Sequence, residues 1–386
     1  MKKILYFFPD DITRPDAGNK TRAINLLHYF KERGFKVDFV SLVQNNGEPE
    51  RYVQLQKDRL FKNFHLLERK PKGKGSLFYF LQYKLWDLFY YWFTYPSRSK
   101  IPTYLTLKLK MGFSELLKAD KYDHVIISYA HSADLISDKA LLKNAHTILD
   151  THDFLTAQFK DKPGFQLGIT FQDEINRLDK FDEVWAISPE EQYIFAQFSK
   201  ADVKLVPMML DGPATSGAAK KYDLVYVGND NVHNVSSVKW FFDKVYPQLP
   251  ADVNICMAGK VVNYVPDLQN VTKIAFAQDL GELYNASKIA LCPMLQGTGI
   301  KVKVVEALAH ALPVVCTTRG VDGLPKHHNG CLVSDDADKF AANITSLLTN
   351  GTLYAEQSRL AEATFKHTFD KKVVFKLLDE AFGLAQ

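Results

Sequence analysis

Short apolar runs alternate with longer amphipathic stretches along most of the chain. Residues 4–8 and 36–42 have the length and composition of buried strands. Between them, residues 21–33 repeat apolar side chains at helical spacing, and Gly34 ends that helix. This strand–helix–strand order is a βαβ unit, whose parallel strands need helices on the faces of their sheet.

The alternation forms two series. They are separated by residues 211–221, which read DGPATSGAAKK, have no apolar period and are typical of a linker. Before this linker we expect further strands at 124–128, 147–150 and 183–187. After it we expect strands at 224–227, 253–258, 274–275, 289–293 and 313–316, helices at 235–246, 280–286, 302–311 and 339–348, and helix throughout 354–386.

These two series predict two Rossmann-like α/β domains, over residues 1–210 and 222–365. Residues 366–386 are expected to form a C-terminal helix that packs back on the N-terminal domain. Open α/β sheets bind ligands beyond the carboxyl ends of their strands. Two such sheets joined by a linker therefore predict a ligand held in a cleft between the domains.

Composition narrows the class of protein further. Of 386 residues, 46% are apolar and the net charge is +4, so we expect a folded chain without the basic excess of a nucleic-acid binder. Four cysteines form no CxxC pair, which favours buried thiols over a metal site. The N-terminal apolar run is short for a signal peptide, and no run of about 18 apolar residues occurs. We therefore expect a cytoplasmic protein.

The segment richest in candidate chemistry is 296–309, QGTGIKVKVVEALA, where a glycine turn feeds a predicted helix. Glycines let backbone N–H groups approach a ligand, and a helix N-terminus favours an anion. We expect Val302, Val305 and Ala309 to face the sheet, with Lys303 and Glu306 on another helical face. A lysine for phosphate and a carboxylate for ribose hydroxyls would suit a nucleoside diphosphate. The alternative is an ordinary glycine turn with a surface Lys–Glu pair, a contact of about 0.2–0.5 kcal/mol.

This segment, continued by PVVCTTRGVDGL at 313–324, resembles the signature of the group 1 glycosyltransferases (family 4-like). The resemblance implies a GT-B fold, in which two Rossmann-like domains face each other across a cleft, and retaining transfer from a nucleotide sugar. It also implies that the N-terminal domain binds the acceptor and that the C-terminal domain binds the nucleotide sugar. Further matches are Tyr226-Val227-Gly228 with Asn234 downstream, Met257-Ala258-Gly259, Ala290-Leu291-Cys292-Pro293, Gly330-Cys331-Leu332-Val333 and, more loosely, Gly18, Arg33-Gly34-Phe35-Lys36-Val37, Asp150-Thr151-His152-Asp153 and Phe181-Asp182-Glu183-Val184-Trp185.

The resemblance assigns donor-binding roles to residues of the C-terminal half. Glu306 matches the family glutamate that binds the nucleotide ribose. The partner glutamate that contacts the donor sugar is replaced by Thr298, which can hydrogen-bond but carries no charge. The loop amides near the phosphates match Gly299, Ile300 and Lys301.

Two basic groups usually neutralise the diphosphate in this family. Lys303 matches one of them and is our first candidate for charge stabilisation in catalysis. The second position falls in the loop after the 224–227 strand, which begins at Gly228 and has no Arg or Lys. His233 or Lys301 is expected to take that role, with Gly228 also contacting the donor.

In the N-terminal half, His152 follows a strand end and resembles the family histidine that contacts the donor sugar at the reaction centre. A structural histidine is the alternative. Asp153 is expected to orient the imidazole or to cap the following helix. Gly18 in the first βα turn lines the cleft in the family, and here a simple turn glycine is the alternative. His131, also after a strand, is a weaker candidate.

A mechanism follows as an expectation. Backbone amides and a lysine in a closed cleft can stabilise the charge that develops on the leaving diphosphate. We therefore expect no cofactor and no metal requirement, and we assign no covalent nucleophile. Closure of the cleft would bring His152 and Gly18 towards Lys303 and Glu306.

An aromatic and basic segment, residues 69–100, stands apart from these motifs. It reads RKPKGKGSLFYFLQYKLWDLFYYWFTYPSRSK, and Lys84 and Asp87 interrupt it, so it does not span a membrane. It suits contact with an anionic membrane surface, which would fit an acceptor on a lipid carrier. The alternative is a buried helix pair of the N-terminal domain.

The leading hypothesis is a glycosyltransferase that uses a UDP- or GDP-sugar and a glycan or lipid-linked acceptor in surface polysaccharide or glycolipid assembly. We place it in the cytoplasm, with peripheral contact to the inner face of the membrane. Two alternatives on the same fold are a nucleotide-sugar 2-epimerase and a catalytically silent assembly partner at the membrane.

Overall fold

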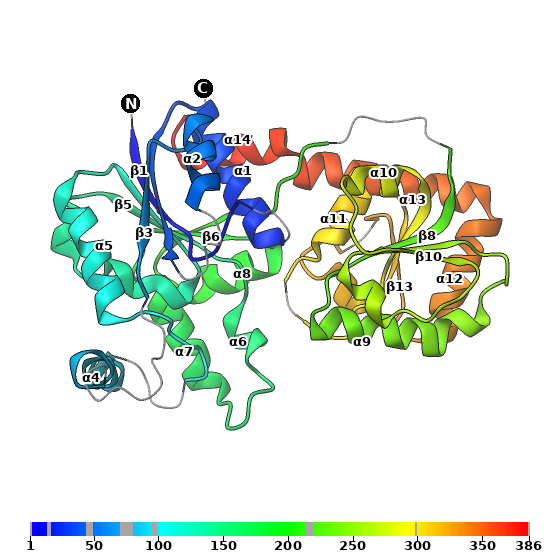
Figure 1. The fold of residues 1–386 in the computed structure, drawn as a ribbon, viewed down its shortest axis with the longest axis horizontal. Helices are drawn as coiled ribbons and strands as arrows, with labels where there is room; N and C mark the ends of the chain where they lie inside the picture. The colour runs from blue at the N-terminus through cyan, green and yellow to red at the C-terminus, as the bar shows by residue number, and fades with distance from the viewer. Residues whose placement is uncertain are drawn as a thin grey trace. The chain divides into compact units, whose positions relative to one another are not determined.

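The computed structural model describes residues 2–13, 17–43, 49–69, 80–94, 99–212, 219–297, 299–326 and 328–384. They form two compact units, Met1–Val206 and Pro207–Gln386. Each unit is a parallel sheet with helices packed on its faces (Figure 1). The two α/β units expected from the apolar pattern are therefore present.

The N-terminal unit contains a seven-stranded sheet in the order β3-β2-β1-β4-β5-β6-β7. The strands are β1 (Lys3–Phe7), β2 (Lys36–Leu42), β3 (Asn63–Leu67), β4 (His124–Ser128), β5 (His146–Asp150), β6 (Glu183–Ala186) and β7 (Asp202–Leu205). The order switches direction between β1 and β4, and in open α/β sheets ligands bind at the carboxyl ends of such neighbouring strands.

The helices of this unit cover both faces of its sheet. They are α1 (Gly18–Glu32), α2 (Pro49–Lys57), α4 (Leu85–Thr94), α5 (Leu107–Ala119), α6 (Leu155–Gln158), α7 (Leu167–Leu178) and α8 (Pro189–Phe198). Because side chains alternate along a strand, Leu5 and Phe7 join the core formed with α5, α7 and α8. Tyr6 between them meets Phe30 of α1 edge to face, with ring centroids 6.2 Å apart.

The apolar pattern did not reveal β3 and β7. Both lie at edges of the sheet, where strands are only partly covered. Their sequences, NFHLL and DVKL, accordingly mix polar with apolar residues and lack the continuous apolar run of a central strand.

The C-terminal unit contains a six-stranded parallel sheet in the order β10-β9-β8-β11-β12-β13. Its strands are β8 (Tyr222–Val227), β9 (Ile255–Ala258), β10 (Val271–Ile274), β11 (Ser287–Cys292), β12 (Val314–Cys316) and β13 (Cys331–Val333). Its helices are α9 (Val232–Trp240), α10 (Leu280–Asn285), α11 (Val302–Ala309), α12 (Ala337–Thr349), α13 (Gly351–Thr364) and α14 (Lys371–Ala381). The switch point here lies between β8 and β11.

Two separate apolar clusters hold the helices of this unit on its sheet. One joins α9 and α12 to the sheet through Val238 and Phe340, and the other joins α11 and α13 through Leu308 and Ala361. Cys256, Cys292 and Cys316 are buried and behave as small apolar residues, as expected.

Further details differ from the expected elements, among them the edge strand β13, which the apolar pattern did not predict. Residues 354–386 are not one helix: α13 ends in a single π-helical turn, Asp370 is extended and bridges Leu210, and α14 then begins. The strand expected at 274–275 is β10, which ends at Ile274. The buried face of α11 consists of Val304, Val305, Ala307 and Leu308, whereas Val302 and Ala309 are only half-buried.

Candidate active site

The glycine turn between β11 and α11 has the backbone that its sequence predicts. Gly297 and Gly299 have φ values of 96° and 77°, a region that side chains with a Cβ rarely adopt. Helix α11 starts after Lys301 without a side-chain cap. A helix start of this kind leaves its first N–H groups to water or to an anionic ligand.

The side chain of Lys301 turns back onto this loop. Its Nζ donates to the carbonyl of Gly299 at 2.6 Å and to that of Gly297 at 3.4 Å, and it lies 3.8 Å from the carboxylate of Asp322. Lys301 therefore stabilises the turn. Thr298, the predicted contact to the donor sugar, lies outside the described residues.

Lys303, in the first turn of α11, extends towards β8 and α9. Its ammonium donates to Asn234 Oδ1 at 2.8 Å and to the Tyr226 hydroxyl at 3.0 Å, and it lies 4.1 Å from the centre of the Tyr226 ring. Burial lowers the pKa of Lys303 to about 8. The lysine is thus fixed in direction, and its charge is poorly solvated in the absence of an anion.

Glu306, one turn further along α11, is held from α10. Its Oε2 accepts a hydrogen bond of 2.8 Å from the buried Tyr284 hydroxyl. Burial raises the pKa of Glu306. His310 stacks on the Tyr284 ring with centroids 5.3 Å apart, and its Nδ1 lies 2.8 Å from Asn285 Oδ1, so Tyr284 is itself fixed.

The alternative of a surface Lys–Glu pair does not describe this helix. Lys303 is bonded to Asn234 and Tyr226, and Glu306 to Tyr284. Within the described ranges, no ion pair joins the two charged side chains. Each of the two charged groups is therefore positioned separately, by partners of its own.

The loop after β8 lies beside the same turn. Gly228 is required by packing, because a Cβ there would come 2.9 Å from the Tyr226 ring and 3.2 Å from Asn234. Asn231 caps α9 by accepting the N–H of Asn234 at 2.9 Å. The His233 ring lies next to Gly297, 3.8 Å from where a Cβ of that residue would be. Its buried Nδ1 has no hydrogen-bond partner among the described residues.

His152 follows β5 in the N-terminal unit and is buried, with 9% of its surface exposed. Its ring stacks on Tyr129 with centroids 4.1 Å apart and tilts against Phe8 at 5.9 Å. Its Nε2 lies 3.2 Å from Asp150 Oδ2. The His152 ring is therefore held by Asp150, the last residue of β5, and by Tyr129, the residue that follows β4.

Asp150 also forms a buried ion pair with Arg22 of α1. The guanidinium donates to Oδ1 from Nη2 at 2.6 Å and from Nε at 2.8 Å, and its Nη1 donates to the Val206 carbonyl. Burial by itself would raise the pKa of Asp150, but the Arg22 guanidinium and the contact with His152 lower it to about 2. This carboxylate therefore stays ionised beside His152.

The expectation that Asp153 caps the next helix is wrong. The backbone N–H groups of Leu155 and Thr156, at the start of α6, donate to the carboxylate of Glu174 on α7, each at 2.8 Å. A carboxylate from a distant helix satisfies the same N–H groups that a local cap would.

Gly18, the other N-terminal candidate, is the first residue of α1. His131 stacks on Tyr129 with centroids 4.9 Å apart, and burial lowers its pKa to about 3. Among the described residues, no three His, Cys, Asp or Glu side chains lie together in a way that could hold a metal ion. The same part of the chain contains no helix long and apolar enough to cross a membrane.

Sequence reasoning missed the residues that hold the candidates in place. Tyr226 and Asn234 belong to the matched motifs, but their spacing in the sequence does not indicate that both accept hydrogen bonds from Lys303. No feature of the sequence pointed to Tyr284 or Tyr129 as supporting residues, because their contacts depend on how α10 and the segment after β4 pack. Asp150 stands two residues before His152 in the matched motif, and a carboxylate at the end of a strand was the signal that could have identified it.

The sequence model of the group 1 glycosyl transferases matches residues 221–350. A curated relative from Klebsiella pneumoniae, described as an uncharacterized 44.6 kDa protein in the cps region, is 23% identical over 301 residues, which cover 70% of this chain and 77% of the relative. The matched range contains the glycine turn and α11.

Solved structures resemble the chain along almost its whole length. HepE of Anabaena, solved with UDP and glucose, has a TM-score of 0.71 at 14% identity and covers 99% of this chain and 100% of its own. TarM, from S. aureus, has a TM-score of 0.72 at 12% identity, with 100% and 98% covered. Sucrose-phosphate synthase of Thermosynechococcus elongatus reaches 0.70 at 14% identity, with 99% and 98% covered. Residues 221–350 therefore match the group 1 glycosyl transferases, and the chain has the GT-B fold of two Rossmann-like α/β units.

Proposed function

We propose that the protein is a retaining glycosyltransferase that moves a sugar from a nucleoside diphosphate donor to a hydroxyl of a glycan or lipid-linked acceptor. The observation that carries the proposal is the first two turns of α11. An uncapped helix start follows a glycine turn, with the Lys303 ammonium held by Asn234 and the Glu306 carboxylate held by Tyr284. Phosphates at the helix start and a ribose diol at Glu306 suit this arrangement.

A UDP-sugar is the donor we propose first, with a GDP-sugar second, because HepE has been solved with UDP and with UDP-glucose. The relative in a cps region supports a role in surface polysaccharide assembly. We assign Gly228, His233, Gly299, Ile300 and Lys301 to the diphosphate side. Thr298, His152 and Gly18 are assigned to the donor sugar and its surroundings.

In the proposed reaction the acceptor oxygen forms a bond to the anomeric carbon of the donor sugar, on the face that the diphosphate leaves. The bond from that carbon to the diphosphate oxygen breaks, and the hydroxyl proton passes to the departing diphosphate. Lys303 and the α11 amides stabilise the negative charge that develops on the leaving group. We propose that these groups suffice without a metal ion and without a covalent nucleophile.

We also propose a cytoplasmic location with peripheral contact to an anionic membrane surface. The helix α4 supports this part, because Trp92 and Phe93 are 79% and 84% exposed. Between residues 69 and 100 the sequence contains seven Lys or Arg and one Asp. Exposed Trp and Phe beside positive charge are typical of elements that bind the surface of anionic bilayers.

Thermal unfolding with UDP, GDP, ADP and NAD, with and without EDTA, tests the proposed function. We expect one nucleoside diphosphate, UDP first, to stabilise the protein, by about 2.7 kcal/mol at 100 times its Kd. The shift should survive EDTA and be lost in Glu306→Ala. Glu282→Ala, at an exposed position of the neighbouring α10, is the matched control and should keep the shift.

No stabilisation by any nucleotide at millimolar concentration would contradict a transferase and favour a silent assembly partner. Turnover of a nucleotide sugar into its 2-epimer without an acceptor would favour the epimerase instead.

A further inference from the structure

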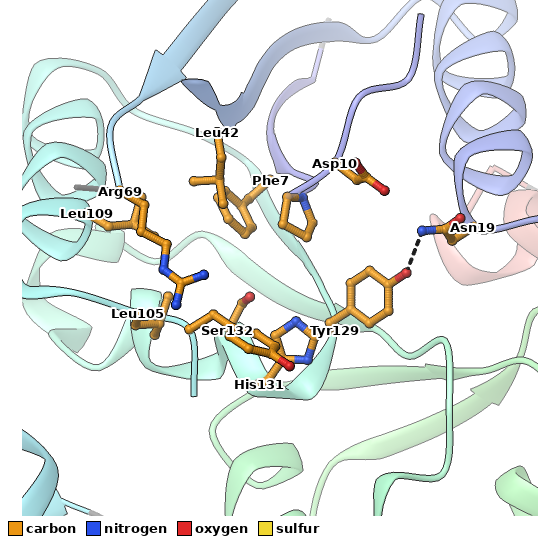
Figure 2. A pocket seen from close by; sticks show the side chains of 12 residues that line it. Phe7, Asp10, Asn19, Leu42, Arg69, Leu105, Leu109, Tyr129, His131 and Ser132 are labelled. Carbon is orange, nitrogen blue, oxygen red and sulfur yellow. Dashed lines mark hydrogen bonds between the residues drawn. The ribbon is translucent and has the colours of Figure 1, made fainter. Parts of the chain in front are cut away.

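A pocket of about 480 Å³ lies in the N-terminal unit, at the carboxyl ends of β1 and β2 and beside the loop after β4 (Figure 2). Neither His152 nor Gly18 lines it. Its walls are Phe7, Pro9, Asp10, Asn19, Leu42, Arg69, Tyr104, Leu105, Leu109, Tyr129, His131 and Ser132. The volume is within the range of small-molecule sites, and the place is the switch point of the sheet.

Most of the lining is aromatic or aliphatic. Tyr129 and His131 stack at 4.9 Å, and Tyr104 meets His131 edge to face, also at 4.9 Å. Since burial lowers the pKa of His131 to about 3, this imidazole is neutral at physiological pH. It therefore offers a flat ring and polar nitrogens but no positive charge. Flat rings of this kind can cover the C–H face of a sugar ring.

The lining contains one basic side chain, Arg69, and one acidic side chain, Asp10, and Figure 2 shows them on opposite sides of the pocket. The Arg69 guanidinium lies 5.1 Å from the centre of the Tyr104 ring and points into the pocket. On the other side, Asp10 accepts the backbone N–H of Asp11 at 2.8 Å, which fixes its carboxylate. The pocket thus has a cationic side at Arg69 and a hydrogen-bond-accepting side at Asp10.

Tyr129 connects this pocket to His152. Its φ of 71° is a strained conformation for a bulky residue, of the kind that concentrates at functional sites. Its hydroxyl accepts a hydrogen bond of 2.8 Å from Asn19, and the opposite end of the stack is the His152 ring at 4.1 Å. A molecule in the pocket would therefore lie against the same ring that supports His152.

We propose that this pocket binds the acceptor, and that Arg69 selects acceptors that carry an anionic oxygen group. This inference rests on the proposed transferase function. The guanidinium presents a planar fork of N–H donors that matches a carboxylate or a phosphate. Asp10 and Asn19 on the other side suit sugar hydroxyls, and the rings between them cover its apolar face. The anionic group is the carboxylate of an acidic sugar or the phosphate of a lipid-linked acceptor.

Saturation-transfer NMR titrations with the full chain, in the presence of saturating UDP, test the proposal. UDP occupies the donor site, so that phosphate probes report on the pocket. The probes are methyl β-D-glucuronide and sn-glycerol 3-phosphate, compared with the neutral methyl β-D-glucoside and glycerol. We expect at least one anionic probe to bind about tenfold more tightly than its neutral counterpart. The probe with the larger preference identifies the source of the anionic group.

Arg69→Gln should abolish that preference while keeping the UDP-induced thermal shift. Arg51→Gln, at an exposed position on α2, is the matched control and should leave the preference unchanged. Equal affinity for charged and neutral probes, no binding of any probe at millimolar concentration, or an unchanged preference in Arg69→Gln would each overturn the proposal. Failure of UDP to stabilise the wild-type protein would instead count against the proposed function.

Discussion

At the scale of a single residue, the proposed donor site couples ligand binding to the protonation of the Lys303 ammonium group. Its pKa is lowered to about 8 because burial penalises the charged form. In the proposed donor site a diphosphate binds the protonated lysine, so the affinity for it should be complete below pH 8 and fall as the pH rises through this value. We expect the Kd for UDP to increase about tenfold from pH 7 to pH 9, measured by isothermal titration calorimetry.

Lys303→Met keeps much of the side-chain length without the charge, and it provides the control. It should bind UDP weakly and with little dependence on pH over the same range. A steep pH dependence that persists in Lys303→Met would assign the titration to another group.

The sequence predicted Lys303, Glu306 and His152 as functional candidates, and the structure fixes each of them through contacts. The sequence did not predict the partners of these three residues, because the partners come from other elements: Asn234 from α9, Tyr284 from α10 and Asp150 from β5. Spacing along one helix shows which residues share a face. It contains no information on which side chains pack against that face.

At the scale of elements, helix α4 supplies the feature most easily tested. Trp92 and Phe93 are among the most exposed large apolar side chains of the described residues, and burying each in a bilayer interface would contribute up to about 1.5–3 kcal/mol. We expect Trp92→Ser with Phe93→Ser to weaken binding to vesicles of phosphatidylcholine and phosphatidylglycerol at least tenfold. Co-sedimentation with the vesicles measures it.

Phe276→Ser is the matched control, because Phe276 is 82% exposed in a loop after β10. This variant should bind vesicles as the wild type does. Higher salt should weaken wild-type binding, since the electrostatic part is screened. Equal vesicle binding by the α4 double variant and the wild type would contradict membrane contact. Concentration-dependent dimerisation lost in that variant would assign the helix to self-association.

The packing of α13 on the sheet gives a second prediction at this scale. Gly330, just before β13, has a φ of 79°, and a Cβ there would lie 2.5 Å from the Cα of Ala361. We expect Gly330→Ala to lower the free energy of unfolding by about 1–3 kcal/mol, measured by chemical denaturation. Gly351→Ala, at the start of α13, meets no atom within 4 Å and should be neutral or stabilising. Similar losses in both variants would show that packing at Ala361 is not the cause.

Central strands and long helices could be predicted because their apolar periods are strong, as in β1, β2 and β4. Edge strands such as β3 and β7 could not, because partial exposure removes that period. The break at Asp370 was also hidden. It depends on a backbone bridge to Leu210, which lies far away in sequence.

On the scale of the whole molecule, the two-series pattern predicted two α/β units, and each has its own apolar core. The core of the N-terminal unit consists of residues between Leu5 and Phe195. The two apolar clusters of the C-terminal unit consist of residues from Tyr222 and Leu224 onwards. The relative placement of the units, and with it the expected cleft, stays a prediction, as does the packing of residues 366–386 on the N-terminal domain.

Separate cores predict two unfolding transitions in calorimetry, and the proposed donor site belongs to one of them. Because Lys303, Glu306 and the glycine turn all lie in the C-terminal unit, UDP should raise the transition of that unit alone. At 100 times its Kd the stabilisation of about 2.7 kcal/mol corresponds to roughly 5–10 °C for a unit of this size. Gly330→Ala identifies the same transition, since it should lower the unfolding temperature of the C-terminal unit and leave that of the N-terminal unit unchanged. A single transition that UDP raises and Gly330→Ala lowers as a whole would mean that the two units unfold cooperatively, so that donor binding stabilises the N-terminal unit as well.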